Sequence, residues 1–80
     1  MSMDSNQPFV LRDTYIELYK LIKLENLANS GGEAKAMIAD GQIKVNGLVE
    51  TRKRRKLIAE DKVEVGGATI EIQGPKTKPG

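Results

Sequence analysis

The spacing of apolar residues changes at Gly41 from the period of a helix to the period of a strand. From Leu18 to Ile38 apolar residues recur every three or four positions, whereas after Gly41 they alternate with polar residues. The first pattern buries one stripe of a helix, and the second buries one face of a sheet. A chain of 80 residues forms a single small core. We therefore predict an α+β domain in which two principal helices pack on a small, largely antiparallel sheet of short strands.

Two helices are expected before Gly41. The first begins at Leu18, and its buried stripe consists of Leu18, Leu21, Ile22, Leu24, Leu27 and Ala28. The second begins after Ser30, because Ser30 and Glu33 form a capping box in which the hydroxyl caps free N–H groups and the glutamate reaches back. This helix is about nine residues long, and its apolar face consists of Ala34, Met37 and Ile38. Gly41 stands where a left-handed residue ends such a helix.

Two hairpins are expected after Gly41. Asn46 and Gly47 supply the positive φ values of a type I′ turn, between strands at 43–45 and 48–49. The second hairpin turns at 66–67 and places Val63 and Val65 opposite Ile70 and Ile72.

The ends of the domain are less strongly patterned than its centre. Either of two β-prone stretches, 9–11 or 14–18, is expected to form an edge strand before the first helix. We place the domain at residues 8–73, with flexible terminal segments at 1–7 and 74–80, because these segments are polar and carry no apolar period.

The positive charge of the chain is concentrated in residues 51–56, the basic run. It holds five of the thirteen Lys and Arg residues and no acid, so the rest of the chain carries eight cations and eleven acids. The nearest acids, Glu50, Glu60 and Asp61, lie outside the run, and we expect its cations to have no local partner. Such a run is suited to contact the phosphates of a nucleic acid. A solvated loop, a localisation signal or a lipid-attracting cluster has the same composition.

The start of the second helix is a further candidate site. Gly31 and Gly32 leave backbone N–H groups unshielded at the positive end of the helix, where a phosphate oxygen can approach, and Lys35 lies one turn further on. A capping box also forms without any ligand, so an ordinary helix start remains an alternative. Lys23 becomes relevant only if the fold places it beside the basic run.

Several functional classes are excluded or made improbable by the residues present. The chain has no Cys and no His, which removes disulfides, thiol chemistry and imidazole acid–base chemistry. The helix start lacks P-loop spacing, and the carboxylates are scattered. We therefore expect no enzymatic activity, no cofactor and no metal. Apolar runs are too short for a membrane span, and we expect a soluble cytoplasmic protein.

The order of elements and several short motifs resemble a known family. The motifs are the residues 30–35, Ser-Gly-Gly-Glu-Ala-Lys; the residues 41–47, Gly-Gln-Ile-Lys-Val-Asn-Gly; the arginine-rich segment ending in Lys56 and Leu57; and the residues 60–63, Glu-Asp-Lys-Val. Together they resemble the S4-like RNA-binding domain, named after a small-subunit ribosomal protein and also called the αL motif. They are most similar to its small stand-alone bacterial branch, the YbcJ-like proteins.

The resemblance implies noncatalytic binding of structured RNA, of the ribosomal or transfer RNA class, by a monomer for which a ribosomal particle is a candidate partner. The residues that match the family's binding surface are Lys23, Ser30, Gly31, Gly32, Lys35, Asn46, Gly47, Arg52, Lys53, Arg54, Arg55 and Lys56. Much of the family has Ser-Arg where this chain has Ser30-Gly31, so phosphate contact there shifts to backbone N–H groups or Lys35. The alternative is a protein-interaction module that docks on an acidic partner, for example within a ribonucleoprotein.

Overall fold

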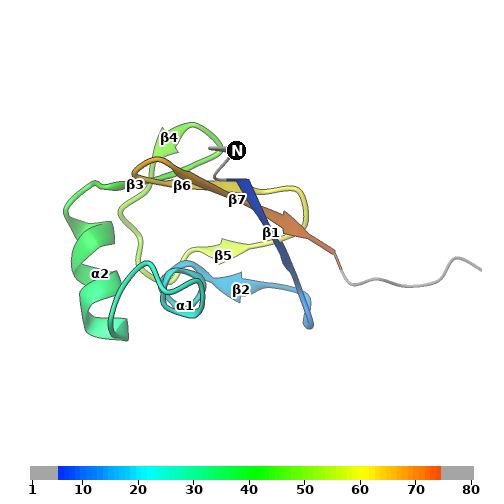
Figure 1. Ribbon diagram of the computed structural model, residues 1–80, viewed down its shortest axis with the longest axis horizontal. Coiled ribbons are helices and arrows are strands. Elements are labelled where there is room, and N and C mark those ends of the chain that lie inside the picture. Colours follow the sequence, from blue (N-terminus) through cyan, green and yellow to red (C-terminus); the bar gives the residue numbers. More distant parts are fainter. Residues whose placement is uncertain (1–5, 75–80) are drawn as a thin grey trace, which may run out of the picture.

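The structure, a computed structural model, describes residues 6–74, and the terminal residues 1–5 and 75–80 of the expected flexible segments lie outside the described residues. In chain order the elements are β1 (Asn6–Val10), β2 (Ile16–Glu17), α1 (Leu18–Leu24), α2 (Gly31–Ala39), β3 (Ile43–Val45), β4 (Leu48–Val49), β5 (Lys56–Leu57), β6 (Lys62–Val65) and β7 (Ala68–Gln73). Figure 1 shows a sheet in one layer, with α1, α2, β2 and β5 in the other. The predicted architecture of two helices packed on a largely antiparallel sheet is confirmed.

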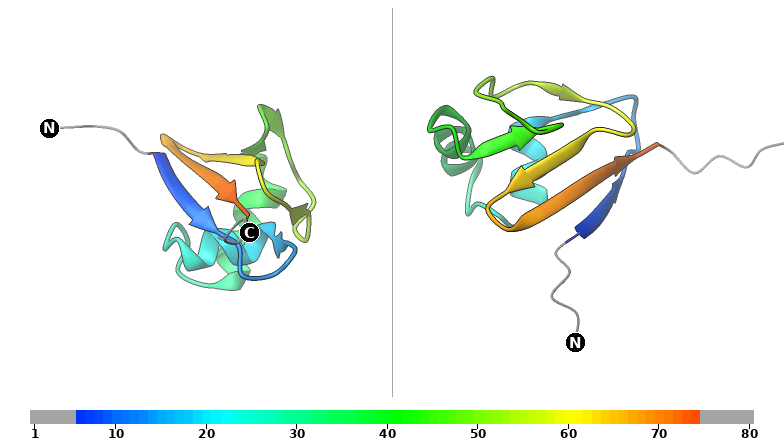
Figure 2. Two further views of the ribbon diagram at one scale, coloured as in Figure 1. Left: turned by 90° about the vertical axis from the view of Figure 1, so that its right-hand side faces the viewer. Right: turned by 90° about the horizontal axis from the view of Figure 1, so that it is seen from above.

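The main sheet has five strands in the order β1-β7-β6-β3-β4. It is antiparallel except at one edge, where β1 pairs parallel with β7. β2 and β5 form a separate two-stranded antiparallel ribbon. Figure 2 shows the sheet from two further sides, with the helices packed against one of its faces. Both β-prone stretches near the N-terminus therefore form strands, of which β1 is the edge strand of the main sheet.

The first strand begins at Asn6, earlier than the expected start of the domain at Pro8, so Asn6 and Gln7 are not part of a flexible segment. The N–H of Leu11 donates to the carbonyl of Gln73 at 2.9 Å. Because bonding directions alternate along a strand, the nitrogen of Pro8 points away from β7. Proline lacks the N–H that an inner strand needs, so its position on β1 fits the free edge of the sheet.

Helix α1 is shorter than predicted, because it ends at Leu24. Asn26 has a φ of 60°, and the N–H groups of Asn26 and Leu27 donate to the carbonyls of Lys23 and Ile22, both at 3.0 Å. This Schellman motif closes the helix with a left-handed asparagine. The predicted buried stripe is wrong at Leu24, which is 61% exposed, whereas the chain returns Ala28 to the core after the helix has ended.

Helix α2 has the predicted start, length and end. The Ser30 hydroxyl accepts a hydrogen bond from the Glu33 N–H at 3.1 Å, and the Glu33 carboxylate accepts one from the Asn29 N–H at 2.6 Å. Gly41 has a φ of 82° and follows the last turn. Ala34 and Ile38 are buried.

The hairpin turns set the register of the strands. Asn46 and Gly47 have φ values of 54° and 86°, as a type I′ turn requires. The second hairpin forms as predicted, with Val63 opposite Ile70, whereas Val65 lies opposite Ala68 and the Ile72 N–H donates to the Asp61 carbonyl beyond the two valines. The two-residue turn at Gly66 and Gly67 fixes this register, because the residues that flank it must pair with each other.

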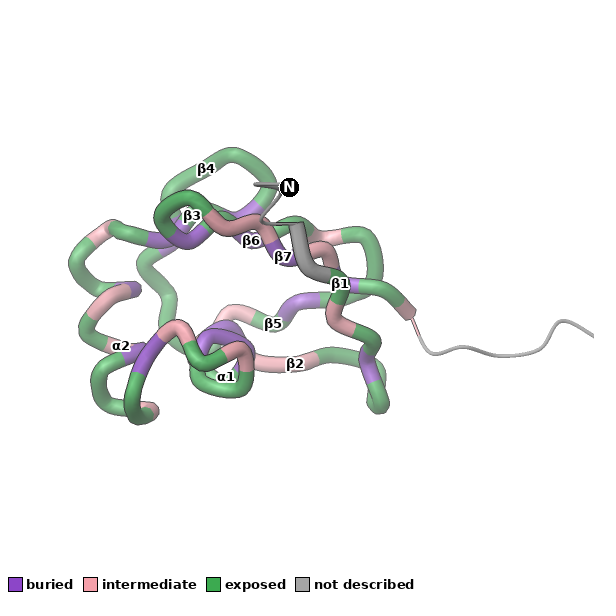
Figure 3. The backbone as a smooth tube through the Cα atoms, in the orientation of Figure 1, coloured by how far each residue is buried: buried purple, intermediate pink, exposed green. Residues whose placement is uncertain are grey.

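The core lies between the sheet and the second layer. Figure 3 shows buried residues in both layers. The helices contribute Leu18, Leu21, Ile22, Ala34 and Ile38, and the strands contribute Ile43, Val45, Leu57, Val63, Val65, Ile70 and Ile72. The alternating strand residues, such as Lys44, Lys62 and Glu64, are exposed on the outer face of the sheet.

Candidate functional site

The basic run connects β4 to β5 and is held against the start of α1. The N–H of Leu18 donates to the carbonyl of Arg55 at 2.9 Å, and the N–H of Tyr19 donates to the carbonyl of Lys53 at 3.1 Å. The first N–H groups of a helix have no partner within the helix and need one elsewhere. The backbone of the basic run supplies two such acceptors, so this segment has a fixed position on the fold.

The expectation that the cations of the run have no local partner is wrong for Arg52 and Arg55. The Glu50 carboxylate accepts hydrogen bonds from the Arg52 side chain at 2.9 and 3.1 Å, from the Arg52 backbone N–H at 3.0 Å and from Arg55 at 2.8 Å. The chain turns within the run, where the Arg55 N–H donates to the Arg52 carbonyl at 3.3 Å. This turn folds both guanidinium groups back onto Glu50.

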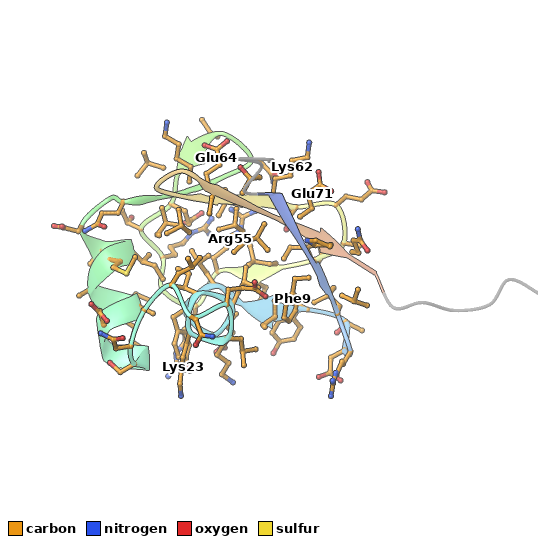
Figure 4. The ribbon with its side chains drawn as sticks, in the orientation of Figure 1. Phe9, Lys23, Arg55, Lys62, Glu64 and Glu71 are labelled. Carbon is orange, nitrogen blue, oxygen red and sulfur yellow. The ribbon has the colours of Figure 1, made fainter. Side chains whose placement is uncertain are left out.

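Glu50 is a buried carboxylate that holds two arginines in place. Only 8% of the residue is exposed. The hydrogen bond from the Arg52 side chain lowers the pKa of Glu50 to about 2, with further contributions from the Arg52 backbone and from Arg55, against the opposing effect of burial. Arg55 lies between the two layers in Figure 4, and its side chain is 27% exposed, whereas that of Arg52 is 74% exposed.

The remaining cations of the run are available at the surface. The side chains of Lys53 and Arg54 are exposed, and within residues 6–74 neither has an ion-pair or hydrogen-bond partner. An open hollow of about 480 Å³ is lined by Arg52, Arg54, Arg55 and Lys56. Four cations therefore surround this space, which we call the cationic hollow. An anion is the ligand that such a lining favours.

Tyr19 connects the basic run to the start of α2. Its backbone N–H is bound to Lys53, and its ring lies 4.6 Å from the Nζ atom of Lys35. A Cβ atom at Gly31 would lie 3.7 Å from the same ring, an ordinary van der Waals distance, so the ring lies beside the start of α2. Tyr19 thus contacts the basic run through its backbone and the start of α2 through its ring.

Lys23 follows Tyr19 by one helical turn on α1 and is exposed. In Figure 4 it extends from the side of α1 that faces away from the sheet. Its ammonium group is therefore on the same row of the helix as the tyrosine. Ser30 and Gly32 lie at the helix start beside Gly31, where the Ser30 hydroxyl is already occupied by the Glu33 N–H.

Asn46 and Gly47 are not brought to this region. Figure 1 shows the β3–β4 hairpin in the layer of the main sheet, whereas α2 starts in the other layer. The Asn46 amide donates to the Asp61 carboxylate at 3.0 Å and accepts from the Lys62 N–H at 2.9 Å. These bonds tie the hairpin turn to the start of β6, so both polar atoms of the Asn46 side chain are used within the fold.

Sequence reasoning missed Glu50 and did not include Tyr19 among the site residues. Glu50 directly precedes the basic run, and its closeness to Arg52 and Arg55 in the sequence was the available signal. Tyr19 lies within the first helix, and helical periodicity alone places it off the buried stripe. Within residues 6–74, none of the helices has the length and apolar character needed to cross a membrane.

Comparison with known proteins identifies the family and the fold of this chain. The family model described as S4 domain matches residues 9–73. The chain belongs to the S4 domain family. A relative of this S4 domain in Escherichia coli K12, named "Putative RNA-binding protein YbcJ", is 47% identical over 58 residues, which is 72% of this chain and 83% of the relative. A protein of Shigella flexneri, named "Uncharacterized protein YbcJ", matches with the same identity and coverage.

A solved structure also resembles this S4 domain. It is the solution structure of YbcJ from E. coli, which is described as revealing an αL motif involved in RNA-binding. The two structures superpose with a TM-score of 0.64 at 40% sequence identity, over 91% of each chain. The expected resemblance to the S4-like domain and to its YbcJ-like branch is confirmed.

Proposed function

We propose that this S4 domain binds structured RNA, of the ribosomal or transfer RNA class, without catalysing a reaction. The observation that carries the proposal is that Tyr19 links the basic run, through the Lys53 carbonyl, to Lys35 of α2, through its ring. We call the following side chains the basic surface: Lys23, Lys35, Arg52, Lys53, Arg54 and Lys56. The names of the E. coli relative and of its solved structure support RNA as the ligand. In this proposal the protein acts as a cytoplasmic monomer, with a ribosomal particle as a candidate partner.

The composition of the basic surface favours phosphates as its main contacts. Arg54 offers a planar set of donors that matches phosphate geometry, and Lys53 adds a compact charge beside it. The backbone bonds at Lys53 and Arg55 fix the run before any ligand arrives. A segment whose backbone is already fixed loses less conformational freedom on binding than a flexible loop.

The aromatic residues favour structured RNA over an extended single strand. Nonspecific single-strand binders stack successive bases on several exposed aromatic rings. This chain has three aromatic residues, and the Tyr19 ring already packs between Gly31 and Lys35. Recognition through backbone and shape, which is usual for folded RNA, fits this surface better.

The test measures how the affinity for RNA depends on salt. We expect the double variant Lys53→Ala/Arg54→Ala to lower the slope of log K against log salt by about 1.4–1.8, at about 0.7–0.9 per lost phosphate contact. These two side chains have no partner among the described residues, so their removal spares the Glu50 cluster. Total transfer RNA and total ribosomal RNA are the probes, and fluorescence anisotropy is the readout.

The matched control is Lys44→Ala/Lys62→Ala, which removes the same charge from the outer face of the sheet. This control is expected to change the slope by less than half as much. Equal slopes in both double variants would refute the proposed surface, and an absence of binding to either RNA would refute the function.

A further inference from the structure

Exposed apolar side chains gather beside the basic surface and serve no purpose in the core. Tyr15, Leu24 and Ile58 are 39%, 61% and 55% exposed. They line an open hollow of about 1090 Å³, together with Ile16 and Ala59. A second hollow of about 570 Å³ continues from it and shares Tyr15, Ile16 and Leu24. We call these five residues, Tyr15, Ile16, Leu24, Ile58 and Ala59, the apolar groove.

The β2–β5 ribbon explains why Tyr15 and Ile58 face outward. Ile16 pairs with Leu57 and Glu17 pairs with Lys56. Leu57 is fully buried, so alternation places Tyr15, Lys56 and Ile58 on the outer side of the ribbon. Leu24 reaches the same region from the last turn of α1.

The apolar groove and the cationic hollow meet at one contact. The Nζ atom of Lys56 lies 4.9 Å from the centre of the Tyr15 ring. Tyr15 lines the groove, and Lys56 lines the cationic hollow. The change from apolar to cationic lining therefore takes place across a single pair of neighbouring side chains.

The charges that line the larger hollow cancel, and the second hollow adds the acid Glu25. The charged residues that line the larger hollow are Arg12, Asp13, Glu17 and Lys20. Glu17 and Lys20 form an ion pair at 3.8 Å. A neutral rim over an apolar floor does not attract phosphate, but it suits an uncharged flat ring.

We infer that the apolar groove takes one unpaired nucleobase of a bound RNA while the phosphate next to that base lies in the cationic hollow. The inference rests on the proposed function. A nucleotide joins a flat apolar ring to an anion, and the Tyr15–Lys56 boundary joins an apolar surface to cations in the same way. An unpaired base in a loop or bulge costs little to move out of its stack. The groove thus allows the protein to recognise an interruption in a paired stem, in addition to binding phosphates.

The test compares two RNA hairpins with the same stem, one fully paired and one with a single bulged 2-aminopurine. We expect the wild-type protein to bind the bulged hairpin about tenfold more tightly, as one base stacked on an aromatic side chain allows. The fluorescence of 2-aminopurine is expected to change on binding. The variants Tyr15→Ser and Leu24→Ser should remove both the preference and the fluorescence change, and should keep the affinity and salt slope for the paired hairpin.

The matched control is Leu48→Ser, because Leu48 is 74% exposed on β4 at the far edge of the sheet from β1. It should leave the preference intact. Equal binding of both hairpins by the wild type, or equal loss of preference in Leu48→Ser and Leu24→Ser, would overturn the inference while the proposed function stands. A change in sedimentation of the free Leu24→Ser protein with an intact preference would assign the groove to a second copy and overturn it as well. If neither hairpin binds, the proposed function fails, and this inference fails with it.

Discussion

Replacement of Glu50 by glutamine removes a buried charge while keeping the shape of the side chain. The pKa of Glu50 is lowered from 4.5 to about 2, chiefly by the hydrogen bond from the Arg52 side chain. At about 1.36 kcal/mol per pH unit, ionised Glu50 stabilises the folded state by about 3 kcal/mol. A domain of 80 residues has a free energy of unfolding of roughly 4–12 kcal/mol. The Glu50 cluster therefore supplies a large share of the stability.

The effect of the Glu50→Gln substitution should depend on pH. Because the pKa of Glu50 is lower in the folded chain than in the unfolded chain, its contribution is complete above about pH 4.5 and is lost as the pH falls through about 2. We expect the variant to be less stable than the wild type by about 3 kcal/mol near pH 6. Near pH 2.5 the Glu50 carboxyl is protonated in the unfolded chain and partly protonated in the folded chain. The difference in stability between the variant and the wild type should therefore fall to about 1 kcal/mol.

Urea denaturation followed by circular dichroism measures this difference, since the chain has no Trp to report on unfolding. The control is Glu64→Gln, which removes the same charge from an exposed position on β6. Its stability should differ little from the wild type at either pH. A stability loss in Glu50→Gln of the same size at both pH values would refute the electrostatic reasoning and indicate a packing effect.

Two further substitutions test the parts of the fold that position the site. Asn46→Ala should lower the free energy of unfolding, measured by urea denaturation, by about 1–3 kcal/mol, because it breaks the bonds to Asp61 and Lys62 and places alanine at a φ of 54°. Asn46→Gly breaks the same bonds but relieves the backbone strain, so equal stabilities of the two variants would contradict a role for φ. Ser30→Ala should cost about 1 kcal/mol and lower Tm by about 4–8 °C, because the Glu33 N–H loses its acceptor; an unchanged Tm in a thermal scan would show that the cap is dispensable.

Local signals in the sequence predicted most of the fold. The Ser30 cap and the Asn46-Gly47 turn each depend on a few neighbouring residues whose side chains or φ values leave little choice. The end of α1 was not predicted, because Asn26 adopts the left-handed conformation without the glycine that usually indicates it. The parallel pairing of β1 with β7 joins the two ends of the domain, and no local pattern encodes it.

The sequence predicted only the part of the candidate site whose charged residues are adjacent in the chain. The basic run is visible because its cations are adjacent in the sequence, but the number that remain unpaired depends on the turn that folds Arg52 and Arg55 onto Glu50. The position of Lys35 relative to the run depends on Tyr19, which belongs to a different helix. Leu24 was assigned to the core because periodicity does not show where a helix stops.

The two bonds from the start of α1 to the carbonyls of Lys53 and Arg55 restrict how the length of this loop can vary. Surface loops generally tolerate inserted or deleted residues. Here a residue added or removed between the two acceptors would shift one carbonyl out of register and leave either Leu18 or Tyr19 without a partner at the helix start. The side chains of Lys53 and Arg54, which have no partner among the described residues, can be exchanged at little cost to the fold, whereas the spacing of the backbone cannot. We expect that related domains vary the identity of these side chains far more readily than the number of residues between the two acceptors, Lys53 and Arg55.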